Sequence, residues 1–329
     1  MPPSLTRRSF VAASALSVLA APLVAEIHYP VEISHALGTT VLRERPERVV
    51  TVNWSNHEVP LALGVVPLGM AAANFGDDDG DGVLPWVAGR LDELGANMPV
   101  LFDEGDGLDF EAIAALRPDV ILAAYSGMSE QDYGILSQIA PTVAYPEGPW
   151  TTRWRDMIRL NSAGMGMAEE GEALIADLEG QISETAARHP ELEGKRAIFL
   201  THLDPTDLSR IRFYTDNDTR VAFLHDLGLT SPGIVQEVSA EGGFAGEISA
   251  EMIDRLDDVD IIVTYGTEAL LDQLDSHMLT GRMPAVERGA VVLLKNDPLG
   301  TAANPTPLSI PYVLDDYADL LAEAAAKAE

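Results

Sequence analysis

The sequence predicts an α/β protein with two lobes joined by a single long helix. Three observations carry this prediction. Apolar, strand-like runs alternate with helical stretches on both sides of a central segment, residues 151–190, whose apolar residues recur at helical spacing for nearly its whole length. A unit of helix followed by apolar strand occurs twice. The length of 329 residues suffices for two domains, each with its own core.

The first 25 residues are predicted to be a signal peptide of the twin-arginine type. Arg7 and Arg8 precede an apolar run that is too short to span a bilayer, and small residues follow, with cleavage expected after Ala20 or Ala25. An ordinary secretory signal that happens to carry two arginines remains the alternative. Either route predicts an exported protein, which we expect in the periplasm.

Residues 26–150 are predicted to form the N-terminal α/β lobe. Strands are expected at RVVTVNW, VVPLGMA and PTVAYP, and DVILAAYSG has the uninterrupted apolar character of a strand in a parallel sheet. Helices are expected at residues 58–63 and 130–139, along LPWVAGRLDEL, and in the stretch that begins after the N-cap residue Asp109 and ends at Pro118.

The helical segment 151–190 contains an expected break at residues 164–166, where two glycines occur. Residues 191–329 then repeat the α/β alternation and are predicted to form the C-terminal lobe. Its strands are expected at KRAIFLTHLD, RIRFYTDND, DIIVTYG and AVVLLK, and a helix over residues 311–327 ends the chain.

A faint internal repeat links the two lobes. Residues 111–125, EAIAALRPDVILAAY, match residues 251–265, EMIDRLDDVDIIVTY, at a constant offset of 251 − 111 = 140 residues. Glu, Ile, Leu and Tyr recur at the same places in a helix that leads into an apolar strand. A chance match between two such units is the alternative. The similar order of elements elsewhere favours two related lobes.

The composition excludes several classes of protein. The 21 Lys and Arg oppose 52 Asp and Glu, a net charge of −31, whereas a nucleic-acid binder needs clustered cations for phosphate contacts. Without any cysteine, the chain has no disulfide, no thiolate metal site, no cysteine nucleophile and no lipid-accepting cysteine, so no membrane anchor is expected. The sequence motifs of serine hydrolases, zinc proteases and phosphate-binding loops are missing, so we predict that the protein is not an enzyme.

Several segments resemble the periplasmic substrate-binding proteins of iron–siderophore ABC transporters, a group related to the vitamin B12 binder. They are RPERVVTVNW with LALGVVPLGM, LDFEAIAALRPDVILAAYSG, LSQIAPTVAYP, the segment with Trp150 and Trp154, and NPTPLSIPYVLDDY, spread over residues 33–325. The resemblance implies two Rossmann-like lobes joined by one long helix, a ferric siderophore as transported ligand and no intrinsic cofactor. It also implies a permease dimer of the inner membrane as partner. We expect the binding protein itself to be a free monomer.

A greasy iron chelate requires a concave aromatic surface with a few polar groups, and in this kind of fold it lies beyond the carboxyl ends of the strands. Aromatic residues and one arginine at those predicted ends are therefore the candidate ligand-binding residues. They are Trp54, Tyr125, Tyr145, Trp150, Arg212, Tyr214 and Tyr265, with Trp86 and Trp154 as second choices. His57 and His202 also follow strands, and for them an ordinary loop role is the favoured alternative.

No metal site of the protein's own is expected. In the loop FGDDDGDG, three aspartates (Asp77, Asp79 and Asp81) and Gly82 fit the opening of a calcium loop, but Ala88 occupies the position where a bidentate glutamate is needed. A solvated acidic loop is the favoured interpretation, and calcium binding stays open.

Glu111 and Glu251, the first residues of the two repeat copies, are the candidate permease-docking residues. Each is expected in the first turn of a helix, where a carboxylate interacts favourably with the helix dipole, and this local role explains both without any partner. The family resemblance implies the other role, in which one glutamate on each lobe pairs with permease arginines.

The sequence thus predicts a periplasmic receptor that captures a ferric siderophore between its lobes and delivers it to an ABC importer. Haem or cobalamin binding on the same fold is the alternative, and an exported hydrolase is a more distant one. Because Lys and Arg are scarce, a nearly neutral hydroxamate chelate is favoured over a strongly anionic catecholate, while the siderophore itself is not identified.

Overall fold

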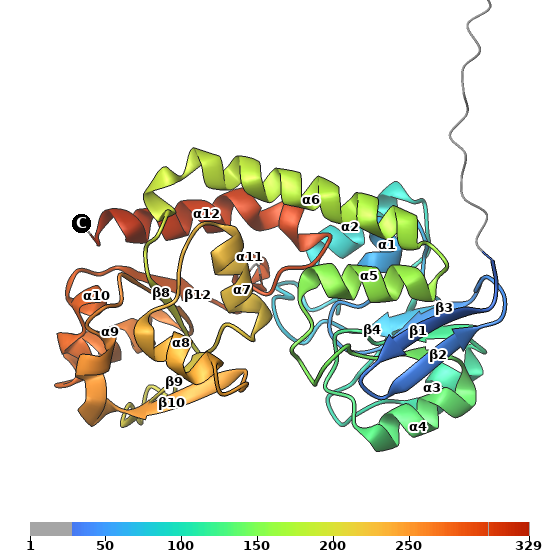
Figure 1. The fold of residues 1–329 in the computed structure, drawn as a ribbon, viewed down its shortest axis with the longest axis horizontal. Helices are drawn as coiled ribbons and strands as arrows, with labels where there is room; N and C mark the ends of the chain where they lie inside the picture. The colour runs from blue at the N-terminus through green and yellow to red at the C-terminus, as the bar shows by residue number, and fades with distance from the viewer. Residues whose placement is uncertain (1–27, 302, 329) are drawn as a thin grey trace, which may run out of the picture.

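The computed structural model describes residues 28–301 and 303–328; the expected signal peptide lies outside them. Two five-stranded sheets, each with helices on both faces, form two lobes side by side (Figure 1). The two-lobed α/β architecture expected from the sequence is confirmed. None of the described helices is both long enough and apolar enough to cross a membrane.

The N-terminal lobe is built on a parallel sheet with the strand order β5-β4-β3-β6-β7. Its strands are β3 (Val49–Thr51), β4 (Gly69–Ala71), β5 (Val100–Phe102), β6 (Val120–Leu122) and β7 (Thr142–Val143). Its helices are α1 (Glu58–Ala62), α2 (Pro85–Glu93), α3 (Phe110–Ala115) and α4 (Glu130–Ile139). An antiparallel hairpin of β1 (Val31–His35) and β2 (Gly38–Leu42) precedes them; neither this hairpin nor β5 was expected, because such short strands leave little periodic signal.

The C-terminal sheet has the equivalent order β10-β9-β8-β11-β12, with β9 antiparallel to both of its neighbours. Its strands are β8 (Ala197–Leu200), β9 (Arg210–Tyr214), β10 (Ala245–Ser249), β11 (Ile261–Tyr265) and β12 (Val291–Leu294). Its helices are α7 (Thr219–Asp226), α8 (Gly233–Ser239), α9 (Glu268–Ser276), α10 (Pro284–Glu287), α11 (Pro298–Thr301) and α12 (Ser309–Ala326), with short 3-10 turns at Pro190–Leu192, Ala250–Leu256 and Thr280–Arg282. Strand β10 was not expected from the sequence.

The two repeat copies occupy equivalent places. Strand β6 lies beside the first strand of its sheet, β3, and β11 lies likewise beside β8. The element before β11 differs from the expected helix: Ala250–Leu256 is a 3-10 segment with non-helical backbone angles at Met252, whereas α3 is a short α-helix. The repeat therefore holds for strand position and not for the geometry of the preceding helix.

The linking segment consists of two helices, α5 (Trp154–Gly164) and α6 (Ala168–Arg188), and not of one continuous helix. Gly166 has a left-handed φ of 66°, and a Cβ there would overlap the Tyr29 hydroxyl, so only glycine fits this break. Helix α5 packs on the N-terminal lobe, while α6 crosses to the C-terminal lobe beside α12 (Figure 1).

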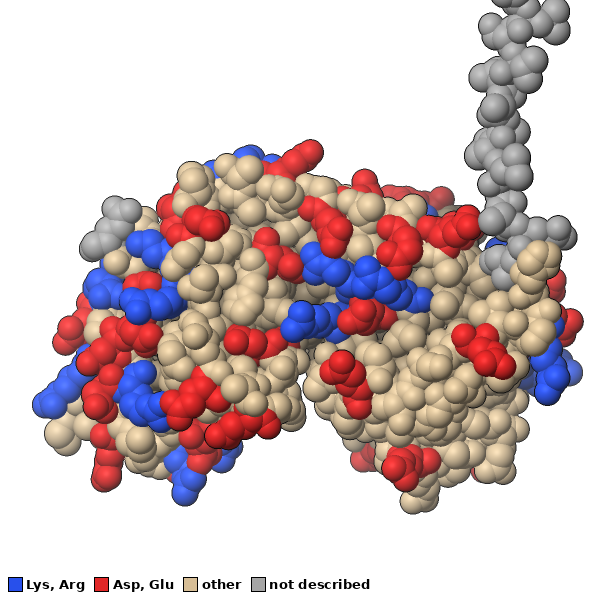
Figure 2. Space-filling model, viewed as in Figure 1, with Lys and Arg blue, Asp and Glu red and all other residues tan. Residues whose placement is uncertain are grey.

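One hydrophobic cluster is continuous through both lobes. It contains residues of the first sheet such as Val49 and Leu122, of the second sheet such as Phe199 and Val263, and Tyr317 of α12. Two smaller clusters cover the outer faces of the two sheets. Because the shared core joins the lobes on the side of α6 and α12, the hollow between them opens on the opposite side (Figure 2).

Candidate ligand-binding site

A cavity of about 370 Å³ lies between the lobes. The chain order in each sheet reverses between two neighbouring strands, β3 and β6 in the first and β8 and β11 in the second, and ligands of such folds bind beyond the carboxyl ends of these strands. The cavity is lined from both lobes by Trp54, Asn74, Phe75, His202, Arg220, Tyr265, Thr301 and Asn304. Trp54 follows β3, His202 follows β8 and Tyr265 ends β11.

Aromatic rings from both lobes meet in this cavity. The imidazole of His202 stacks on the ring of Tyr265, with centroids 4.6 Å apart. Phe75, from the loop after β4, places its edge against Tyr265 (5.5 Å) and His202 (6.1 Å). The Nε1 atom of Trp54 is buried and has no hydrogen-bond partner in the described part of the chain. It is an available donor beside a cavity with aromatic walls.

Arg220 is the one charged side chain among the described residues that line this cavity. It lies in the first turn of α7, where its Nε and Nη2 atoms donate to the two carboxylate oxygens of Asp218 at 2.8 and 2.7 Å. Its guanidinium group lies 3.7 Å from the centre of the Tyr214 ring. The Asp218 side chain is fully buried, so Arg220 has a fixed geometry and a fully desolvated counter-ion.

The other ionisable groups of the cavity are neutral at physiological pH. Burial raises the pKa of Tyr265 to about 12, against the lowering effect of nearby Arg220, and burial likewise raises the pKa of Tyr125. Burial first, and the charge of Arg220 second, lower the pKa of His202 below its ordinary value of 6.5. The cavity therefore presents one fixed positive charge within a wall of aromatic and neutral polar side chains.

A second recess, of about 230 Å³, lies in the N-terminal lobe at Trp150. Trp150 packs edge-on against Tyr125, with ring centroids 5.3 Å apart, and its indole lies so close to Gly127 that a Cβ there would overlap it. Trp150 has φ 60° and Asn53, in the same recess, also has φ 60°. Left-handed non-glycine residues cost free energy and concentrate at functional sites.

The structure brings five of the seven predicted ligand residues to the cavity or its border. Trp54 and Tyr265 line the cavity. Tyr125 receives a hydrogen bond from the cavity residue Asn304 (Nδ2) at 3.3 Å, and Trp150, in the second recess, packs on the Tyr125 ring. Tyr214 lies beneath the guanidinium group of Arg220.

Tyr145 and Arg212 do not belong to the site. Tyr145 follows the edge strand β7, is buried in the outer core cluster of its lobe, and donates its hydroxyl hydrogen to Met128 O at 3.2 Å. Arg212 is largely exposed on β9 and pairs with Glu247 of β10 at 2.7 Å, because the two strands are antiparallel neighbours. The charged group of the cavity is Arg220, which lies eight residues later.

The second-choice tryptophans also serve other roles. Trp86 packs against Tyr312 of α12 and donates its indole hydrogen to Glu58, away from the cavity. Trp154 is buried, and its indole donates to Asp226 at 3.0 Å. Of the two histidines, His202 lines the cavity, whereas His57 is buried in α1's N-cap position.

Five residues that line the cavity were not predicted from the sequence: Arg220, Asn74, Phe75, Thr301 and Asn304. The sequence did carry a signal for Arg220, since Asp218 is a recognisable N-cap and an arginine two residues later falls in the first turn of the helix. The other four lie outside the periodic segments of the sequence, where residue spacing does not indicate which way a side chain points.

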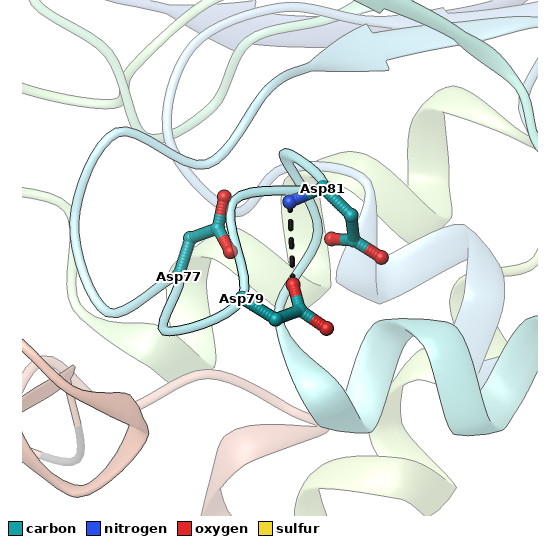
Figure 3. Close-up of side chains that lie close together, drawn as sticks. All are labelled: Asp77, Asp79 and Asp81. Carbon is teal, nitrogen blue, oxygen red and sulfur yellow. Dashed lines mark hydrogen bonds between the residues drawn. The ribbon is translucent and has the colours of Figure 1, made fainter.

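The acidic loop after β4 forms a compact turn (Figure 3). Carboxylate oxygens of Asp77, Asp79 and Asp81 lie within 4.8 Å of one another. They accept hydrogen bonds from backbone N–H groups of their own loop, including those of Gly80 and Gly82 to Asp77, which lower the pKa of Asp77. These internal bonds account for the loop conformation.

The two candidate docking glutamates are both exposed. Glu111 lies in the first turn of α3, and Glu251 lies in the 3-10 segment that follows β10. Figure 1 shows α3 and β10 on the side of the molecule away from α6, one on each lobe.

The comparisons with known proteins agree with this architecture. Residues 49–298 match the family model described as periplasmic binding protein. A crystal structure of PiaA from Streptococcus pneumoniae TIGR4 in complex with ferrichrome is 44% identical, with a TM-score of 0.86 over 91% of this chain and 99% of that chain. A periplasmic solute-binding protein from Mycobacterium smegmatis is 26% identical, with a TM-score of 0.74 over 90% and 98% of the two chains. The probable siderophore-binding lipoprotein YfiY of Bacillus subtilis is 27% identical over 71% of this chain and 67% of its own. By its fold, its inter-lobe cavity and the match over three quarters of its length, this chain belongs to the periplasmic binding protein family.

Proposed function

We propose that this protein binds a ferric siderophore in the cavity between its lobes and delivers it to an ABC importer in the inner membrane. The observation that carries the proposal is the cavity itself, where aromatic rings of both lobes surround one fixed guanidinium group. A ferric chelate receives its iron ligands from the siderophore, so the protein needs apolar contact area and a few orienting groups. Trp54, Trp150, Tyr125, Tyr214 and Tyr265 with Arg220 supply both.

The ligand class that fits best is a ferric hydroxamate such as ferrichrome. One cationic side chain suits a nearly neutral chelate, whereas a tris-catecholate carries several negative charges and would leave most of them unpaired in this cavity. The 44% identity to PiaA, whose structure holds ferrichrome, supports the same class.

Ligand titrations test this proposal. We expect ferrichrome to quench the tryptophan fluorescence of the protein saturably, without turnover, and haem, cobalamin and a ferric catecholate to bind more weakly by about 100-fold or more. A haem or cobalamin absorbance change at equimolar ligand would identify one of these as the ligand instead. Release of a hydrolysed product would indicate an enzyme. Saturable ferrichrome binding with unchanged ligand supports the receptor function.

For transport we propose that Glu111 and Glu251 dock the protein on the permease dimer. Each is exposed and each belongs to a different lobe, which fits a two-fold symmetric partner. Permease arginines would pair with these carboxylates in two hydrogen bonds each, which gives orientation as well as energy.

Replacing Glu111 and Glu251 together by Ala is expected to lower ferrichrome-dependent iron uptake by cells roughly tenfold, the effect of about 1.4 kcal/mol of docking free energy. Affinity in solution should stay unchanged, because neither residue lines the cavity. The matched control replaces two exposed glutamates on the opposite side, Glu184 of α6 and Glu323 of α12, and should leave uptake normal. Normal uptake in the first double variant would refute the docking role.

We further propose export to the periplasm through the twin-arginine route, on the basis of Arg7 and Arg8, and a free monomer there.

A further inference from the structure

The segment formed by residues 303–308 connects the ligand cavity to the start of α12. Asn304 lines the cavity and donates a hydrogen bond to the Tyr125 hydroxyl. Two residues later, the Thr306 hydroxyl donates to the carboxylate of Glu58, and the backbone N–H of Leu308 donates to the same oxygen at 3.1 Å. Glu58 belongs to α1 of the N-terminal lobe, so it anchors a segment that returns from the other lobe.

Glu58 is fully buried, with none of its surface exposed to solvent. Its second oxygen accepts a hydrogen bond from Trp86 Nε1 at 3.0 Å. Within the described residues no cation pairs with it; instead, three donors converge on two oxygens, an arrangement that fits an ionised carboxylate. The position at the N-terminus of the 18-residue helix α12 also favours a negative charge.

Burial nevertheless opposes ionisation. It raises the pKa of Glu58 from 4.5 to about 7, although the hydrogen bonds from Thr306, Trp86 and Leu308 lower it. When the carboxyl group takes up a proton, one of its oxygens becomes a donor. Loss of the negative charge turns the three charge-assisted hydrogen bonds into weaker neutral ones, and the new O–H group faces donors instead of an acceptor, so the hold on the segment weakens.

We infer that Glu58 is a positioning residue for the ligand cavity: its ionised carboxylate holds residues 306–308, which fixes Asn304 and Thr301 against the ligand, and protonation loosens this hold and lowers affinity. The inference rests on the proposed function, because a ferric siderophore reports the state of the cavity. Glu58 itself contacts no ligand.

None of the other titratable or charged groups around Glu58 that are described below changes its charge near pH 7, so a change in affinity there reports Glu58. His57, beside it on α1, has a pKa lowered by burial to about 4 and stays neutral above pH 6. Arg90 of α2 donates to backbone carbonyls at the end of α1, and an arginine keeps its charge throughout this range. Tyr312 of α12 packs on the Trp86 ring. In the cavity, burial lowers the pKa of His202 below 6.5.

The decisive measurement is the affinity for ferrichrome between pH 6.5 and 8.0, by calorimetry, in the wild-type protein and in the Glu58→Gln variant. We expect wild-type affinity to rise about fivefold across this range, the effect of one regained hydrogen bond. The variant, which cannot ionise at this position, should have constant affinity near the low-pH value. Thr306→Ser keeps the hydroxyl donor and the wild-type profile, whereas Thr306→Val should move the midpoint to higher pH.

A second readout needs no ligand. The indole N–H signal of Trp86, one of four tryptophans, should titrate with a midpoint near pH 7 in the nuclear magnetic resonance spectrum of the wild type and not in Glu58→Gln, with Trp86→Phe giving the assignment. A wild-type affinity that does not change with pH, or a Glu58→Gln variant with the wild-type pH profile, would overturn the inference about Glu58 and leave the proposed function intact. Absence of ferrichrome binding at every pH would overturn the proposed function and, with it, the coupling to the cavity.

Discussion

Replacing Arg220 by Ala is expected to abolish tight ferrichrome binding and to lower the free energy of unfolding by about 3–5 kcal/mol. The two effects have separate causes. The cavity loses its charged group, and Asp218, whose side chain is fully buried, loses the cation that compensates its desolvation. Calorimetric titration and urea unfolding of the same variant measure them.

The double variant Asp218→Asn/Arg220→Ala separates these causes. An asparagine at position 218 can still cap the helix by accepting a hydrogen bond from the backbone N–H of residue 220. Because no buried charge remains at either position, stability should recover to near the wild-type value. Affinity should stay low because the guanidinium group is missing. If this double variant bound ferrichrome as tightly as the wild type, Arg220 would have only a structural role.

Replacing Trp150 by Ala is expected to weaken ferrichrome binding about 100-fold, since truncating an aromatic anchor of a binding site costs about 2–4 kcal/mol. Trp150 is an exposed residue, with 36% of its surface accessible, so stability should change little. Calorimetry is the appropriate measurement, because the substitution also removes a fluorescent reporter.

The Gly127→Ala variant tests the recess at Trp150 without replacing the tryptophan itself. A Cβ at this position overlaps the indole of Trp150, so the ring must move and affinity should fall. Gly134→Ala, in α4 of the same lobe, is the matched control and should bind normally, because a Cβ there would meet no atom within 4 Å. Wild-type affinity in both Trp150→Ala and Gly127→Ala would exclude this recess from the binding site.

Local spacing in the sequence was enough to predict the strands that end at the cavity. Apolar runs marked β3, β6, β8, β9 and β11, and the residues that follow or end these strands are the predicted Trp54, Tyr125, Tyr214 and Tyr265. The apolar character of a strand and the alternation of its side chains depend on neighbouring residues alone, so this information is present in the sequence.

The order of the strands in each sheet could not be predicted from local sequence. Tyr125 and Tyr145 both follow apolar strands and look equivalent in the sequence. Tyr125 follows β6, where the order of the sheet reverses, whereas Tyr145 follows the edge strand β7 and packs into the core. Only the order of strands in the folded sheet distinguishes the two, because that order depends on which strands pair across long stretches of chain.

The sequence by itself determined the two α/β lobes and the helical link with its break at the glycines, while the export signal and the aromatic ligand site stay predictions. The tertiary structure decided that Arg220 and not Arg212 reaches the cavity, and that Glu58 meets Thr306 across 248 residues of chain. Periodicity and capping act between neighbours and can be read along the chain. The direction of a loop side chain and the partner of a buried charge depend on how the lobes pack, and residue spacing carries no record of that packing.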